Sequence, residues 1–267
     1  MARWHQWHKP RWREERMAQN PLAVSLTRQM GSRRSKPLSA PRDRMSGLRL
    51  HLMATPGDGL SRVLDASRVY LANSDRPSVG YLPAAALDAA FFLEETRSCF
   101  SGVAAVELLD PVSMDRESIL RMVDHISLLY VPGGNTFVLS HRLQQASLMA
   151  EIAQRVRNGL PLVGFSAGAV LCGTDILNSN DRNACGCRDF AGLGLVPFSL
   201  NVHYAFGDAQ PERDERIAAY HAFHSVPVLA LEDDAHLRVE DARIDLVEGA
   251  AWLFDGTGTR TTYRGTS

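Results

Sequence analysis

The hydrophobic pattern from residue 48 onward alternates between short apolar runs and longer amphipathic segments. This alternation is typical of a mostly parallel sheet whose faces are covered by helices. We expect strands at 48–54, 78–82, 103–109, 128–132 and 160–165, and helices at 84–96, 115–125, 136–158 and 167–172. The long helix ends at Asn158 and Gly159, because both residues tolerate the left-handed conformation of a helix cap.

The pattern changes in the last third of the chain. A polar loop is expected at 178–188, a helix at 211–224, and short strands at 226–231, 237–239, 244–247 and 251–254. Strands separated by so few residues favour antiparallel pairing. The predicted fold class is therefore α/β, a mostly parallel sheet flanked by helices with an antiparallel C-terminal extension, within one domain at 45–267.

The first 44 residues carry a formal charge of +8, whereas the rest of the chain carries −9. They hold three of the four tryptophans and show no helical or strand period. We expect a disordered extension, or a start placed too early with Met45 opening the domain. An Arg- and Trp-rich arm for nucleic acid and an organelle transit peptide are alternatives, although Glu14 and Glu15 count against a transit peptide.

The composition, 45% hydrophobic and 22% charged, is that of a water-soluble globular protein. The chain has no apolar stretch of eighteen residues, so no membrane span is expected. Its four cysteines form no secreted disulfide framework, which favours the cytoplasm. Cys185 and Cys187 have no second Cys/His pair at ligand spacing, so neither a metal nor another cofactor is expected.

The main chemical signal is Gly164-Phe165-Ser166-Ala167-Gly168, a G-x-S-x-G between an apolar strand and a helix-forming run. In this context the pattern predicts a sharp turn that lifts the serine hydroxyl clear of the sheet. The glycines are needed because side chains at those positions would meet neighbouring backbone. Ser166 is thus a candidate nucleophile, and the backbone N–H of Ala167 a candidate oxyanion donor.

A serine hydroxyl needs a base to remove its proton, and that base is usually a histidine held by a carboxylate. His203 is the best candidate, because it follows an apolar stretch that would deliver the ring to the carboxyl edge of the sheet. His221, His224 and His236 are weaker candidates.

A second glycine turn, Pro132-Gly133-Gly134-Asn135-Thr136, also leaves a strand and enters a helix. Free N–H groups at such a turn can bind an anion or a developing oxyanion. A tight turn with Asn135 as a helix N-cap explains the same residues equally well.

Together these motifs resemble the peptidase E family of aspartyl dipeptidases and their cyanophycinase relatives. The matching pieces, in the family's order, are the 132–136 turn, the 164–168 turn, Asn180-Asp181 and Asn201-Val202-His203. The resemblance implies a flavodoxin-like fold similar to that of class I glutamine amidotransferases. It also implies that Ser166 attacks an amide, that His203 is general base and then acid, and that the Gly134 and Ala167 amides form the oxyanion hole.

The sequence leaves open which carboxylate is the partner of the histidine. The family's pattern offers an Asp in the loop after the nucleophile, matched by Asp181, and a Glu near a later strand end. In that later segment the natural alignment places Asp233 where a Glu is expected, with Glu232 as a substitute. We expect Asp181 to be functionally required, whichever carboxylate touches the imidazole.

The resemblance further implies cleavage of very small peptides next to an aspartyl residue. Asn135 and Arg182 are candidate substrate-binding residues, and Arg213 is a second candidate cation for the aspartyl carboxylate. A small peptide is the expected partner, nucleic acid is not expected, and a homodimer is left open.

Two alternatives come from other classes. An ordinary α/β-hydrolase esterase shares the G-x-S-x-G and the order Ser, Asp, His, but no His-Gly-Gly-Gly stretch precedes Ser166. A non-catalytic binding or regulatory relative would keep the turn without the activity. A glutamine amidotransferase requires Cys where this chain has Ser166.

Overall fold

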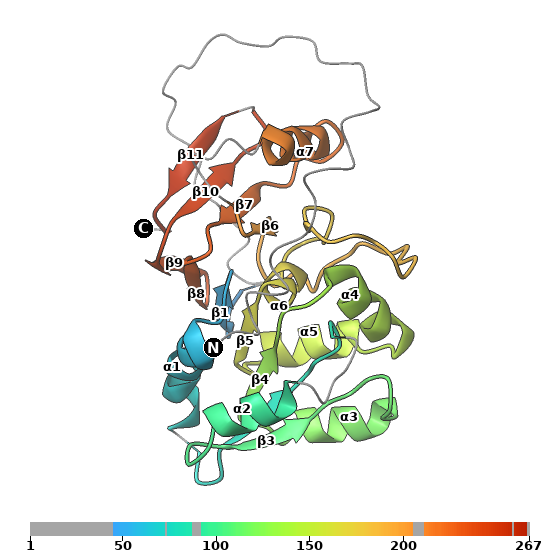
Figure 1. Ribbon diagram of the computed structural model, residues 1–267, viewed down its shortest axis with the longest axis vertical. Coiled ribbons are helices and arrows are strands. Elements are labelled where there is room, and N and C mark those ends of the chain that lie inside the picture. Colours follow the sequence, from blue (N-terminus) through green and yellow to red (C-terminus); the bar gives the residue numbers. More distant parts are fainter. Residues whose placement is uncertain (1–44, 73, 87–91, 205–210, 258, 266–267) are drawn as a thin grey trace. The chain divides into compact units, whose positions relative to one another are not determined.

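The computed structural model describes residues 45–72, 74–86, 92–204, 211–257 and 259–265, shown in colour in Figure 1. All of them belong to one of the two units into which the chain divides. The expectations for residues 1–44 lie outside the described residues. Within the described ranges, the helices are too short or too polar to cross a membrane.

A seven-stranded sheet in the order β3-β2-β4-β5-β1-β8-β9 forms the larger part of the fold. Five of its strands run parallel, and β8 and β9 extend it as an antiparallel pair beside β1. The strands are β1 (Arg49–Met53), β2 (Ser78–Tyr81), β3 (Ala105–Leu108), β4 (Leu128–Val131), β5 (Leu162–Phe165), β8 (His236–Glu240) and β9 (Arg243–Glu248). Strands β4 and β5 are buried along their whole length, as expected for central strands covered on both faces.

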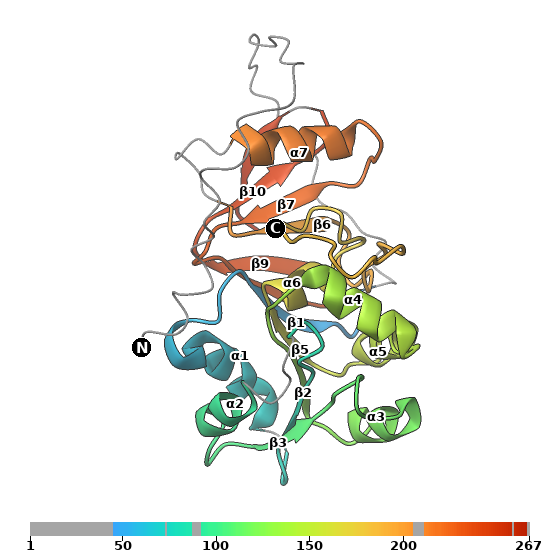
Figure 2. The same cartoon turned by 45° about the vertical axis from the view of Figure 1, so that its right-hand side comes forward.

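Helices cover both faces of this sheet. Figure 2 shows α1 and α2 on one side of the strands and α3, α4 and α5 on the other. The helices are α1 (Ser61–Leu71), preceded by the short 3₁₀ turn η3 (Asp58–Leu60), α2 (Leu93–Cys99), α3 (Arg116–Val123), α4 (Thr136–Gln145), α5 (Met149–Arg157) and α6 (Ala167–Leu171). The predicted α/β class with a mostly parallel sheet is confirmed.

A second, four-stranded sheet in the order β11-β10-β7-β6 carries the helix α7 (Pro211–His221). Its strands are β6 (Ser199–Val202), β7 (Val228–Leu231), β10 (Ala251–Phe254) and β11 (Arg260–Tyr263). Strands β6 and β7 are parallel, whereas the other pairs are antiparallel. The strand before His203 therefore ends at the edge of this smaller sheet, which corrects the expectation that it joins the large one.

Two predicted helices differ from the structure. The helix expected at 136–158 is broken into α4 and α5 at Ser147, whose φ of 55° is left-handed. In the described part of 84–96, residues 84–86 form a turn, and α2 begins only at Leu93. The Ala85 carbonyl instead accepts a hydrogen bond from the Asn135 N–H (3.1 Å), so this backbone packs on the 132–136 turn.

One cluster of buried side chains connects the two sheets. It includes Leu50 and Leu162 of the large sheet and Leu200 and Leu229 of the small one. Burial of apolar surface at about 25 cal/mol per Å² therefore stabilises the docking of the sheets as well as each sheet.

A buried pair of histidines lies where β1 meets β8. His51 Nδ1 is 2.7 Å from His236 Nε2, and His51 is only 6% exposed. Burial lowers the pKa of His51 to about 3, helped by His236 and Arg238, and lowers the pKa of His236 to about 4, helped by Arg62 and Arg238. Both rings are thus held neutral in the folded protein near neutral pH.

This pair predicts an acid-sensitive stability. Because the folded pKa values lie below the ordinary 6.5, the pair's contribution is complete above about pH 6.5 and is lost as the pH falls towards 3. Each ring held neutral lowers the free energy of unfolding by about 1.4 kcal/mol per unit fall in pH in this range, so we expect the free energy of unfolding to fall by several kcal/mol between pH 7 and pH 4. Urea unfolding of His51→Gln should show a shallower pH dependence than the wild type. The exposed-histidine variant His125→Gln is the control, and equal slopes for all three proteins would contradict the expectation.

Candidate active site

Ser166 sits on a strained turn between β5 and α6. Its φ of 49° and ψ of −115° lie outside the regions that residues with side chains normally occupy. The Ser166 N–H donates to the Met53 carbonyl at the end of β1 (2.9 Å), which fixes the turn to the neighbouring strand. The side chain is half-buried at the carboxyl ends of the central strands.

The two glycines of the turn are required by close backbone approach. A Cβ on Gly168 would lie 2.1 Å from the Val131 carbonyl oxygen, and one on Gly164 would lie 2.8 Å from the Gly168 carbonyl oxygen. Neither contact is possible between real atoms, so the backbone could not keep this path with larger residues.

Ser166, His203 and Asp233 form a hydrogen-bonded series. Ser166 Oγ is 3.1 Å from His203 Nε2, and His203 Nδ1 is 2.6 Å from Asp233 Oδ1. The nucleophile candidate comes from the large sheet, the histidine follows β6 of the small sheet, and Asp233 lies on the turn between β7 and β8. The structure brings together three residues that are far apart in the sequence.

The other two candidate carboxylates point elsewhere. Glu232 Oε1 accepts a hydrogen bond from Trp252 Nε1 (2.8 Å). Asp181 Oδ2 accepts from the Thr136 N–H and hydroxyl (2.7 Å each) and from the Ser179 hydroxyl (3.0 Å). Asp181 therefore holds the first turn of α4, and Asp233 is the carboxylate that contacts the imidazole.

The second glycine turn lies against the first. A Cβ on Gly133 would lie 3.1 Å from Ser166 Cβ, and one on Gly134 would lie 2.6 Å from the Ala85 carbonyl oxygen. Asn135 is the N-cap of α4, since its Oδ1 accepts from the Val138 N–H (3.0 Å). Its Nδ2 donates to the Arg182 carbonyl (3.0 Å), so its polar atoms serve the turn. The two interpretations of the 132–136 turn, a helix N-cap at Asn135 and N–H groups for an anion, are therefore compatible in one structure.

The backbone of His203 is held by polar side chains. Asn180 Nδ2 donates to the Val202 carbonyl (2.7 Å), and Arg213 Nη1 donates to the His203 carbonyl. Burial, reinforced by Arg216, lowers the pKa of Arg213. His203 has a left-handed φ of 60°, which these contacts help to maintain. Arg182 is exposed, on the loop after Asp181.

Two residues that the sequence pattern did not single out also contact the series. Thr55 and Arg62 hydrogen-bond to the Asp233 carbonyl, across separations of 178 and 171 residues. Separations of this size leave no signal in local periodicity or in a motif, so only the fold brings these residues to the site.

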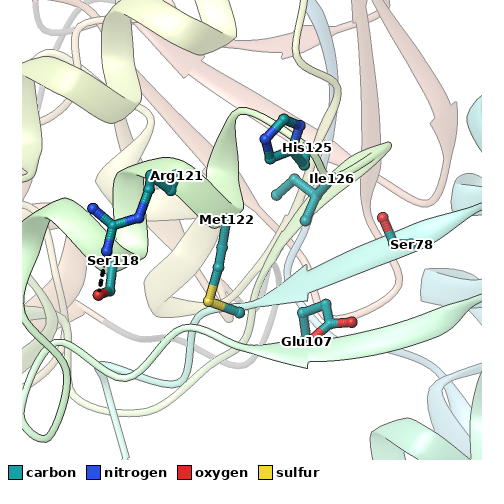
Figure 3. Close-up of a pocket in the computed structure, with 7 residues that line it drawn as sticks. All are labelled: Ser78, Glu107, Ser118, Arg121, Met122, His125 and Ile126. Atoms are coloured by element: carbon teal, nitrogen blue, oxygen red, sulfur yellow. Dashed lines mark hydrogen bonds between the residues drawn. The ribbon is translucent and has the colours of Figure 1, made fainter.

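Other polar clusters lie away from this series. The cavity in Figure 3, of about 550 Å³, lies between β2, β3 and α3, and is lined by Ser78, Glu107, Ser118, Arg121, Met122, His125 and Ile126. In it Arg121 Nη2 donates to Ser118 Oγ (2.8 Å). Among the described residues, no three His, Cys, Asp or Glu side chains gather as a metal site, and Cys185 and Cys187 are free thiols.

A hydroxyl, an imidazole and a carboxylate in hydrogen-bonded series, carried by an α/β fold, form the arrangement that serine hydrolases share. The chain belongs to peptidase family S51, whose model matches residues 57–247. This membership confirms the resemblance to peptidase E and favours a peptidase over the esterase alternative.

Similar proteins carry related names. The chain is 37% identical to the Drosophila melanogaster "probable alpha-aspartyl dipeptidase" over 54% of this chain and 62% of that protein. It is 29% identical to the peptidase E of Nostoc sp. over 63% of this chain and 72% of that protein. It is 35% identical to the peptidase E of Streptomyces coelicolor over 46% of this chain and 53% of that protein. The matches thus span about half to three quarters of these relatives.

Solved structures show the same fold. A peptidase from an acI-B1 actinobacterium has a TM-score of 0.63 at 17% identity, covering 84% of this chain and 98% of that one. A protein from Listeria monocytogenes EGD-e has a TM-score of 0.59 at 20% identity, covering 81% of this chain and 98% of that one.

Proposed function

We propose that this protein is a serine peptidase that hydrolyses small peptides, with Ser166 as nucleophile, His203 as base and Asp233 as its carboxylate partner. The observation that carries the proposal is the hydrogen-bonded series, 3.1 Å from Ser166 Oγ to His203 Nε2 and 2.6 Å from His203 Nδ1 to Asp233 Oδ1. Both separations are hydrogen-bond distances, as proton transfer requires.

The geometry suits a two-step acyl transfer. His203 Nε2 accepts the Ser166 proton as Oγ attacks the peptide carbonyl, and then gives that proton to the leaving amine. Water subsequently attacks the acyl-enzyme, and the same nitrogen takes its proton and returns it to Ser166. Asp233 accepts the Nδ1–H hydrogen bond, which fixes the tautomer and stabilises the imidazolium between steps.

The oxyanion hole in this proposal is formed by the N–H groups of Gly134 and Ala167. Neither group donates to a described backbone acceptor, and Ala167 directly follows the nucleophile in the chain. Asp181 and Asn135 support this hole indirectly, because both hold the turn that carries Gly134.

A peptide with an N-terminal aspartyl residue is the proposed substrate. The relative named an alpha-aspartyl dipeptidase supports this class. Arg182 and Arg213 are the candidate cations: the backbone carbonyl of Arg182 accepts from Asn135, and the Arg213 guanidinium donates to the His203 carbonyl. A guanidinium pairs well with the side-chain carboxylate of such a substrate.

The proposal predicts a reactive serine and a dipeptide activity. A fluorophosphonate should label Ser166, identified by peptide mass mapping, and labelling should abolish hydrolysis of Asp-Xaa dipeptides measured by release of amino acids. Matched Asn-Xaa and Ala-Xaa dipeptides are the controls for the carboxylate. An unlabelled Ser166 in folded protein would support the non-catalytic alternative instead.

A further inference from the structure

The direction of the Asp233 carboxylate is set by a turn rather than by a strand. The turn joins β7 of the small sheet to β8 of the large sheet and is closed by a hydrogen bond from the Ala235 N–H to the Glu232 carbonyl (2.9 Å). The Asp233 side chain is 75% exposed, so packing restrains it little. Its aim at His203 therefore depends on how the backbone of Asp233 is held as well as on the hydrogen bond to His203 Nδ1 (2.6 Å).

Thr55 and Arg62 hold that backbone. Thr55 Oγ1 donates to the Asp233 carbonyl oxygen at 2.7 Å. Arg62 Nη1 donates to Thr55 Oγ1 at 3.0 Å and reaches the same carbonyl at 3.5 Å. The threonine hydroxyl therefore accepts from the arginine and donates to Asp233, which gives it a defined orientation.

Arg62 is itself fixed at its other edge. Its Nε and Nη2 pair with the carboxylate of Glu248 on β9 at 3.0 Å and 3.1 Å. The Arg62 side chain is 23% exposed, and a two-point pair of this kind restrains a guanidinium more than a single contact does. The series Glu248, Arg62, Thr55 thus ends on the Asp233 carbonyl.

The same segment also holds the nucleophile. The Met53 carbonyl accepts the Ser166 N–H (2.9 Å), and Thr55 follows two residues later. The Ala54 N–H donates to the Ala235 carbonyl (3.2 Å), a further link to the turn. Ser166 and Asp233 are therefore placed relative to one stretch of chain, residues 53–55.

We infer that Thr55 and Arg62 are positioning residues that aim the Asp233 carboxylate at His203. The inference rests on the proposed function, since it concerns the same serine mechanism. Neither residue touches the reacting atoms. Their effect follows from geometry, because misplacing a catalytic group by about 1 Å can reduce the rate on the order of 100-fold.

Thr55→Val is the main test, because valine keeps the branched shape and lacks the hydroxyl. We expect kcat to fall about 10- to 100-fold while KM changes less than about threefold, since the lost alignment acts on the transition state. Thr55→Ser should stay within about threefold of the wild type because it restores the hydroxyl. Arg62→Ala should resemble Thr55→Val, whereas Arg68→Ala, on the same helix and paired with Asp65 at the surface, should leave kcat unchanged.

A double-mutant cycle separates positioning from general damage. In the Asp233→Asn background, Thr55→Val should change the rate of fluorophosphonate labelling less than about twofold, because no carboxylate remains to be aimed. The inference would be overturned if Thr55→Val slowed labelling equally in both backgrounds, or if Thr55→Ser were as slow as Thr55→Val. The proposed function would stand in either case as long as Ser166→Ala is inactive. Turnover that survives Ser166→Ala would overturn the proposed function and this inference together.

Discussion

Replacing Ser166 with alanine should lower turnover of an Asp-Xaa dipeptide by about 10⁶-fold, because the members of a serine triad act as a unit. Only the hydroxyl is removed, and the Ser166 N–H that donates to the Met53 carbonyl (2.9 Å) remains. The fold should therefore persist, with a circular dichroism spectrum like that of the wild type. Stopped-time assays with amino-acid analysis can measure the loss.

A matched control is Ser113→Ala. Ser113 is exposed and donates to Asp110 (2.6 Å), away from the triad, so its removal should leave turnover unchanged. If purified, folded Ser166→Ala kept more than about 1% of wild-type turnover, another nucleophile would be at work.

Asp233→Asn should lower kcat by about 10⁴-fold, because an amide favours the wrong histidine tautomer and stabilises the imidazolium poorly. The substitution is close to isosteric, and the side chain is 75% exposed, so stability should change little. Steady-state kinetics and thermal unfolding of the same preparation separate the two effects.

The neighbouring carboxylates provide the comparison. Glu232→Gln keeps an oxygen that can accept from Trp252 Nε1 (2.8 Å), and should leave kcat within severalfold of the wild type. Asp181→Asn should mainly loosen the start of α4, where Oδ2 accepts from Thr136 and Ser179. If folded Asp181→Asn lost more activity than Asp233→Asn, the activity would depend more on the turn that Asp181 holds than on the Asp233 carboxylate, which would contradict the expected ranking.

The Ser166 turn was predictable because its requirements are local. A side chain on Gly164 would collide with backbone four residues away, and one on Gly168 would collide with the adjacent strand β4. The apolar strand β5 leads directly into this turn. The parallel strands were predictable for the same reason, since strands such as β4 are apolar throughout.

Other elements depended on contacts that no local pattern records. Helix α1 was missed because small residues, Ala66 and Ser67, occupy part of its buried face and weaken the apolar period. The break at Ser147 was missed although the pattern marks it: the buried Leu143 and Leu148 are five residues apart, whereas one helix face repeats every three or four residues.

The sequence also could not predict the separate small sheet or decide which carboxylate contacts His203. Strands β6 and β7 are parallel and fully buried, so they resemble strands of the large sheet. Glu232, Asp233 and Asp234 are consecutive, and the path of the turn decides which of them meets His203.

The division of the Ser–His contact between two sheets has a consequence for refolding. A chain in which only the parallel core has formed could present the hydroxyl, but its imidazole would still be elsewhere. The 3.1 Å contact thus arises only once the later strands dock. Recovery of activity during refolding would therefore report the docking of the two sheets rather than formation of the parallel core alone.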